Sequence, residues 1–66
     1  SIMSKCKYVK RIYVPYQGLF GWVMKNIRGE YFVTTKDGYT VMSNNSLDYI
    51  IEVMSKEFKG CWFEDI

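Results

Sequence analysis

Short runs of mostly apolar residues, separated by polar turn residues, make up the first two thirds of the chain. Four of these runs are rich in β-branched and aromatic residues, which is typical of β-strands: residues 7–16, 19–27, 30–36 and 39–43. Turn residues separate the runs, and Asp37-Gly38 is the strongest turn signal because a type I′ hairpin needs positive φ at both positions. We therefore expect four consecutive antiparallel strands.

The two turns after the second and third runs set the expected register. If Arg28-Gly29 and Asp37-Gly38 are two-residue turns, Met24, Val33 and Met42 share one face of the sheet, beside Trp22. Val23, Thr34 and Val41 then share the other face. Both faces are apolar, so we expect a strongly curved sheet, either an SH3-like partial barrel or a sheet covered by a helix and by a partner.

The pattern becomes helical after residue 45. Apolar residues spaced three or four positions apart form one stripe along the expected helix: Leu47, Ile50, Ile51, Met54 and Phe58. Asn45 or Ser46 is the expected N-cap, and Gly60 is the expected C′ glycine. Residues 61–65 predict a short last strand. The order β-β-β-β-α-β predicts one α+β domain over residues 1–66, with a small curved antiparallel sheet packed by one amphipathic helix.

Length and composition limit the size of the core and indicate where in the cell the protein is expected. The chain has 66 residues, of which 48% are hydrophobic and 18% aromatic, and a chain this short buries only about 60% of its unfolded surface. No apolar run approaches the roughly 20 residues that a membrane helix needs. The sequence shows no secretory signal, and two cysteines at opposite ends of the chain are typical of reduced thiols, so we expect a cytoplasmic protein. A disulfide between Cys6 and Cys61 is the alternative if the first and last strands pair.

Charge is distributed unevenly along the chain. Residues 1–29 carry six basic residues and no acid, whereas residues 30–66 carry three basic and seven acidic residues, or +6 against −4. This asymmetry predicts a basic end and an acidic end, which could steer a charged partner or pair with a second copy in a homodimer.

The residues that usually carry catalysis are scarce. Histidine, the commonest general base and metal ligand, is absent. Two distant cysteines, Cys6 and Cys61, cannot make a structural zinc site of the usual kind without histidine. Adjacent Glu64 and Asp65 on a strand would point to opposite faces. We therefore expect no catalytic residue, no metal and no cofactor, and predict a non-enzymatic binding protein.

Protein binding is the first functional hypothesis. Twelve aromatic residues and four methionines exceed what a core of this size hides, and these types are enriched where proteins meet. The expected partner-binding residues cluster around the Gln17-Gly18 turn and in the basic half: Arg11, Tyr13, Tyr16, Phe20, Trp22 and Arg28.

Nucleic-acid binding is the alternative. Its expected contacts are basic residues of the N-terminal half: Lys7, Lys10, Arg11, Lys25 and Arg28. Strict alternation puts Tyr8 and Lys10 on one face of the first strand and Arg11 and Tyr13 on the other, which leaves no clean stacking platform. The pI of about 8.6 is also below the value above 9 that is typical of dedicated nucleic-acid domains.

No motif assigns the chain to a family. Its shortness, its richness in tyrosine and methionine and its lack of catalytic groups resemble, in general character, small phage proteins that bind and block host factors. This resemblance implies an inhibitory or regulatory role.

Overall fold

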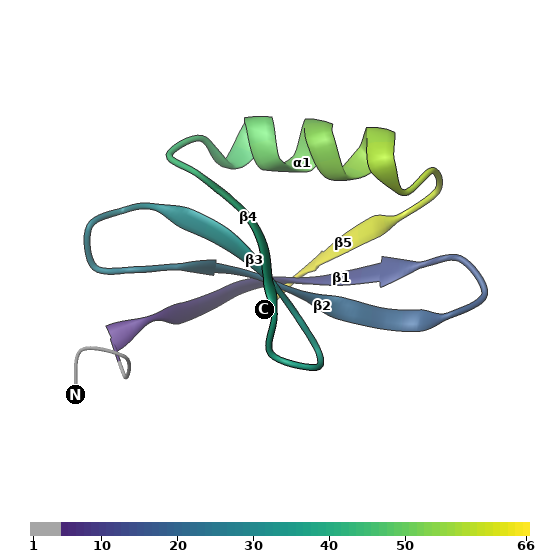
Figure 1. Ribbon diagram of the computed structural model, residues 1–66, viewed down its shortest axis with the longest axis horizontal. Coiled ribbons are helices and arrows are strands. Elements are labelled where there is room, and N and C mark those ends of the chain that lie inside the picture. The colour runs from purple at the N-terminus through teal and green to yellow at the C-terminus, as the bar shows by residue number, and fades with distance from the viewer. Residues whose placement is uncertain (1–4) are drawn as a thin grey trace.

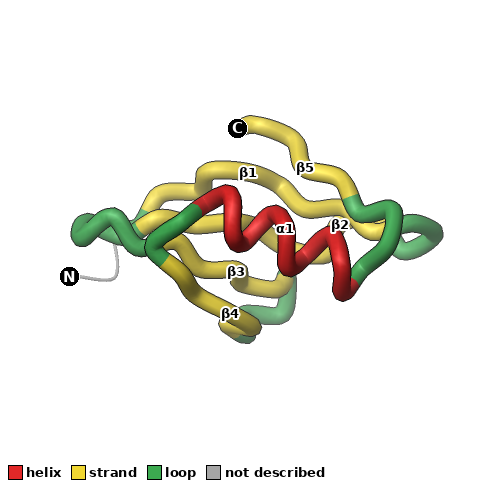
Figure 2. Tube along the Cα trace, turned by 90° about the horizontal axis from the view of Figure 1, so that it is seen from above, coloured by secondary structure: helices red, strands yellow, loops and turns green. Residues whose placement is uncertain are grey.

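A five-stranded antiparallel sheet and one helix form the fold in the computed structural model, which describes residues 5–66. The elements are β1 (Lys7–Val14), β2 (Gly18–Lys25), β3 (Tyr31–Thr35), β4 (Thr40–Asn44), α1 (Leu47–Glu57) and β5 (Trp62–Asp65). The strand order is β4-β3-β2-β1-β5, so the chain leaves the sheet at one edge, crosses it in α1 and returns at the other edge (Figures 1 and 2). The predicted α+β order of elements is confirmed.

The sheet is open and strongly twisted. Figure 1 shows β4 crossing the view at a steep angle to β1 and β2, with α1 along one side of the sheet. Because β4 and β5 lie at opposite edges, the finer expectation of an SH3-like partial barrel is not confirmed.

The core lies between one face of the sheet and α1. Ile12, Val23 and Val33 from the three central strands are fully buried against Ile50 and Met54 of the helix. Burying each such side chain contributes about 1.5–3 kcal/mol, so this small cluster is the main source of stability. Within the described residues, no helix is long and apolar enough to cross a membrane.

The helix begins and ends close to the predicted signals. The Ser46 hydroxyl accepts a hydrogen bond from the Tyr49 amide at 3.2 Å, which confirms Ser46 as the N-cap. At the other end the C-cap is Phe58, so Gly60 lies one position later than expected. Gly60 has φ +82°, and a Cβ there would meet Pro15 Cγ at 2.9 Å. Gly60 therefore allows the helix–β5 loop to pack against the β1–β2 turn.

The predicted register of β2 and β3 is wrong by one residue. Val23 pairs with Val33, and Met24 pairs with Phe32. The cause is Asn26, whose side-chain oxygen accepts hydrogen bonds from the amides of Arg28 and Glu30, both at 3.0 Å. This five-residue connection replaces the expected two-residue turn, so Met24 lies on the face opposite Val33 and Met42.

The β3–β4 hairpin is present, but not as the expected type I′ turn. The Gly38 amide donates to the Thr35 carbonyl at 2.9 Å, and the Thr35 amide donates to the Tyr39 carbonyl at 2.7 Å. Only Gly38 has positive φ in this turn. The connection therefore has three residues, and a bulge at Val41 follows it.

Candidate functional site

The face of the sheet turned away from α1 carries an aromatic surface. Cross-strand partners point to the same face, so the pairing of Arg11 with Trp22 and of Tyr13 with Trp62 places these side chains together, opposite buried Ile12 and Val23. We call this surface the open face. Its large side chains and its charged residues are Tyr8, Arg11, Tyr13, Leu19, Trp22, Met24, Phe32, Trp62 and Glu64.

A β-bulge in β1 determines which aromatics reach the open face. The register shifts between Tyr8 and Lys10, where Val9 is the extra residue and packs against the core. Tyr8 therefore shares a face with Arg11 and not with Lys10. The strict alternation assumed from the sequence is wrong at this point, because a bulge places two successive residues opposite one.

The aromatic rings of the open face contact one another in two pairs. Tyr8 and Trp22 meet edge to face with ring centroids 5.4 Å apart, and Tyr13 stacks on Trp62 with centroids 4.2 Å apart and planes 16° from parallel. Tyr8 is nevertheless 55% exposed and Trp62 52% exposed. The rings hold one another in place while presenting apolar surface to solvent.

The two charged side chains of the open face neutralise each other. Arg11 Nη1 donates to Glu64 Oε1 at 3.0 Å, and the Tyr13 hydroxyl donates to the same oxygen at 3.3 Å. One residue further along the ladder, on the helix side of the sheet, Lys10 forms an ion pair with Asp65. The expected separate basic and acidic ends are therefore partly wrong, because the antiparallel β1–β5 pairing brings the two charge types together.

The structure brings together three of the six residues expected to bind a partner. Arg11, Tyr13 and Trp22 are neighbours on the open face. Tyr16 lies fully exposed in the β1–β2 turn, and Phe20 packs against Phe58 of the helix–β5 loop at a centroid distance of 4.9 Å.

The predicted aromatic cluster around the turn does not form. The register shift between Ile12 and Tyr13 makes Phe20 the extra residue on β2, and this bulge turns Phe20 toward the helix side. Arg28, the sixth residue, lies in the β2–β3 loop at the opposite end of the sheet from that turn (Figure 1).

Three open-face aromatics were missed by the sequence analysis: Tyr8, Phe32 and Trp62. Trp62 could have been found, because alternation in the last strand separates Trp62 and Glu64 from Phe63. The face on which Phe32 lies relative to Trp22 depends on the β2–β3 register set by Asn26. The face on which Tyr8 lies depends on the bulge at Val9. The sequence carries no comparably strong signal for either feature.

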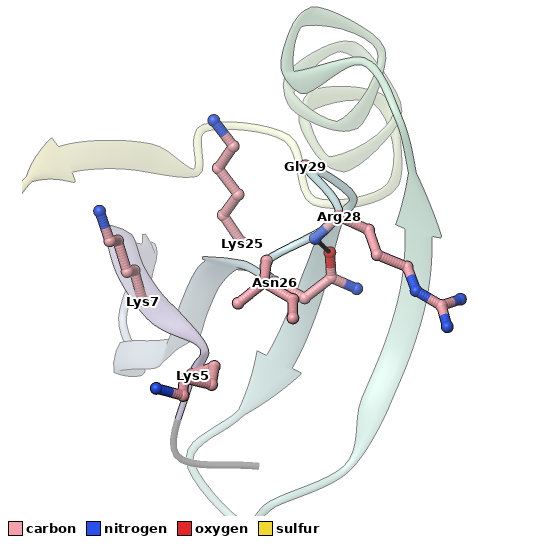
Figure 3. A pocket seen from close by; sticks show the side chains of 7 residues that line it. Lys5, Lys7, Lys25, Asn26, Arg28 and Gly29 are labelled. Atoms are coloured by element: carbon pink, nitrogen blue, oxygen red, sulfur yellow. Dashed lines mark hydrogen bonds between the residues drawn. The ribbon is translucent and has the colours of Figure 1, made fainter. Parts of the chain in front are cut away.

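A second surface, rich in lysine, lies at the end of the sheet where β1 begins. An open cavity of about 450 Å³ is lined by Lys5, Lys7, Lys25, Asn26, Ile27, Arg28 and Gly29. Lys7 and Lys25 are direct cross-strand partners and, by alternation, point to the helix side of the sheet. Figure 3 shows both side chains extending in a similar direction from neighbouring strands, with the Arg28 guanidinium turned away from them. We call this surface the basic cavity.

The residues expected to contact nucleic acid are thus divided. Lys10 and Arg11 are occupied by Asp65 and Glu64, whereas Lys7 and Lys25 line the basic cavity. Lys7 and Lys25 point to the helix side of the sheet, whereas the exposed rings lie on the open face.

Residues 5–66 contain no cluster of three or more histidine, cysteine or carboxylate side chains that could hold a metal ion. Cys6 and Cys61 are free thiols. No protein-family model, curated protein or solved structure matches the chain.

Proposed function

We propose that this chain is a non-enzymatic domain that binds another protein through the open face, with a regulatory or inhibitory effect on that partner. One observation carries the proposal: five aromatic side chains lie on the sheet face that α1 leaves uncovered, around a single neutralised ion pair. These are Tyr8, Tyr13, Trp22, Phe32 and Trp62.

The broad side of the molecule has the size of a protein interface, and the open face has the composition of one. The molecule measures 36 × 22 × 20 Å, so a broad side has a footprint on the order of 700 Å², close to the roughly 800 Å² that each partner contributes to a standard interface. Aromatic residues, methionine and arginine are enriched in such interfaces, and charged residues are depleted at their centres. A partner that fits this face presents a mainly apolar surface with few charges.

Nucleic-acid binding is the second candidate, and the placement of charge disfavours it. Proteins that stack bases on aromatic rings place lysine or arginine beside those rings to follow the phosphates. On the open face Arg11 is neutralised by Glu64. Lys7 and Lys25, which form no ion pair with any residue of 5–66, point to the other side of the sheet. A bound strand could not use both features at once without passing around the edge of the sheet.

The experiment compares capture of proteins from an extract of the source cells by four immobilised chains: wild type, Tyr8→Thr, Trp62→Thr and the control Tyr49→Ala. Tyr49 is an equally exposed tyrosine (48%) on α1, on the opposite side of the molecule. We expect wild type and the control to retain the same protein, and the two open-face variants to lose it. Thermal unfolding of each variant identifies any loss that is due to unfolding.

Three results would contradict the proposal. The first is equal retention by all four chains. The second is binding of single-stranded oligonucleotides that Trp62→Thr abolishes. The third is a dimer of the purified chain that Tyr8→Thr dissociates, which would assign the open face to a second copy.

A further inference from the structure

We propose that the basic cavity binds a compact anion that contains two or three linked phosphoryl groups. Lys7 and Lys25 are its principal ligands, and Lys5 also lines the cavity. This site is separate from the open face and independent of the function proposed for it.

The pairing of Lys7 with Lys25 is the first observation. Like charges directly opposite each other on neighbouring strands destabilise a sheet. Elsewhere on β1 the chain avoids this cost, because Lys10 faces Asp65 and Arg11 faces Glu64 across the β1–β5 ladder. That ladder does not extend to Lys7, and within the described residues neither Lys7 nor Lys25 forms an ion pair. An anion between the two ammonium groups would remove the repulsion.

The lining of the cavity is the second observation. Every residue that lines it is either cationic or uncharged. The carboxylate of Glu30 in the same loop accepts a hydrogen bond from the Asn26 side-chain amide at 2.9 Å. Glu30 lines an adjoining cavity that shares Lys5, Asn26, Ile27 and Arg28 with the basic cavity, but it is not part of the lining of the basic cavity itself. The cavity therefore presents positive charge without an internal counter-ion, and low salt strengthens its attraction for an anion.

The loop that forms one wall of the cavity is held in shape by its own hydrogen bonds. Besides the two bonds to the Asn26 side chain, the Gly29 amide donates to the Asn26 carbonyl at 3.1 Å, and the Asn26 amide donates to the Glu30 carbonyl at 3.0 Å. The Lys25 ammonium also lies over the Tyr31 ring, 5.3 Å from its centroid. A ligand would therefore need to reorient mainly the flexible lysine stems seen in Figure 3.

The chemistry of the lining defines the ligand class. Each lysine ammonium carries three donors and no acceptor, which suits oxygen anions that present several acceptors in a small volume. The 450 Å³ of the cavity gives room for more than one phosphoryl group, since a water molecule occupies roughly 30 Å³. A single-stranded nucleic acid is a poorer match for this cavity, because the exposed aromatic rings that could stack on its bases lie on the other side of the sheet.

The site is tested by titrating the purified chain with pyrophosphate and with tripolyphosphate. Binding is followed by calorimetry and by the NMR chemical-shift changes of residues 7, 25 and 31. We expect saturable binding to one site that weakens as salt rises. Lys7→Glu and Lys25→Glu should each weaken binding by about tenfold or more. Lys36→Glu is the matched control, because it makes the same charge change in the exposed β3–β4 turn at the other end of the sheet.

Stability provides an independent readout. Lys7→Glu turns the repulsive pair with Lys25 into an attractive one, so its melting temperature should equal or exceed that of wild type while binding is lost. A variant that binds less because it folds less well would show the opposite.

Three results would overturn the site. The first is that neither polyphosphate binds saturably, and the second is that Lys36→Glu loses as much polyphosphate affinity as Lys7→Glu. The third is that single-stranded oligonucleotides bind more tightly than the polyphosphates and that Trp62→Thr weakens this binding. The open-face variants Tyr8→Thr and Trp62→Thr should leave polyphosphate binding unchanged, which keeps this site experimentally distinct from the open face.

Discussion

The Arg11 guanidinium donates to the Glu64 carboxylate at 3.0 Å, and this contact joins strands whose residues are 53 positions apart in the chain. It lies at the junction of β1 with the C-terminal strand β5, beside the stacked rings of Tyr13 and Trp62. The ion pair therefore does two things. It cancels charge on the open face, and it fixes the strand that contributes Trp62 to that face.

A double-mutant cycle on Arg11 and Glu64 measures the contribution of this ion pair. Both side chains are partly exposed, at 41% and 47%, so we expect a coupling energy of about 0.2–1 kcal/mol that decreases at high salt. Urea unfolding of Arg11→Ala, Glu64→Ala and the double variant gives the value. Zero coupling at low salt would show that the contact does not stabilise β5.

The local signals of this sequence were sufficient to predict its elements. The turn residues at Asp37-Gly38, the N-cap at Ser46 and the helical stripe that contains Ile50 and Met54 lie where the pattern placed them. Each of these signals depends only on neighbours within a few residues, so the sequence alone contains it.

The composition of each face could not be predicted in the same way. The bulge at Val9 and the loop held by Asn26 each shift the register by one residue, and such a shift moves a side chain to the other face. Tyr8 and Phe32 reach the open face only because of these two irregularities. The candidate site therefore depends on pairings between strands, which the sequence leaves open.

Gly21 is expected to be intolerant of any side chain. A Cβ at this position would lie 2.1 Å from the Thr34 carbonyl oxygen and 2.8 Å from Thr35 Cα, so Gly21→Ala must separate β2 from β3. We expect a loss of about 3 kcal/mol in the free energy of unfolding.

Gly29→Ala is the control for this prediction. Its Cβ meets nothing within 4 Å, but its φ is +85°, so we expect a cost of about 1 kcal/mol from conformational strain alone. Denaturant unfolding of both variants separates steric from conformational cost. A Gly21→Ala variant no less stable than Gly29→Ala would contradict the close approach of β2 and β3.

Tyr16 combines a strained backbone with a fully exposed side chain. Its φ is +68°, and it is the one non-glycine residue with positive φ in the described chain. Asparagine tolerates this conformation better, so Tyr16→Asn should stabilise the protein by about 0.5–1 kcal/mol and raise its melting temperature by several degrees.

Tyr39→Asn is the control for this prediction, because Tyr39 is also exposed (71%) but lacks the positive φ. Calorimetry of the two variants should show a gain for Tyr16→Asn alone. Equal melting temperatures would mean that the left-handed conformation at Tyr16 carries no strain.

The claim that the open face binds a protein is tested most directly by photo-crosslinking inside the source cells. The photoreactive residue p-benzoylphenylalanine replaces Trp62 in one variant, Tyr8 in a second, and Tyr49 on the far side of the molecule in a third. We expect positions 8 and 62 to crosslink to the same protein and position 49 not to crosslink to it. Crosslinking of that protein from position 49 with equal yield, or of nucleic acid alone from positions 8 and 62, would contradict it.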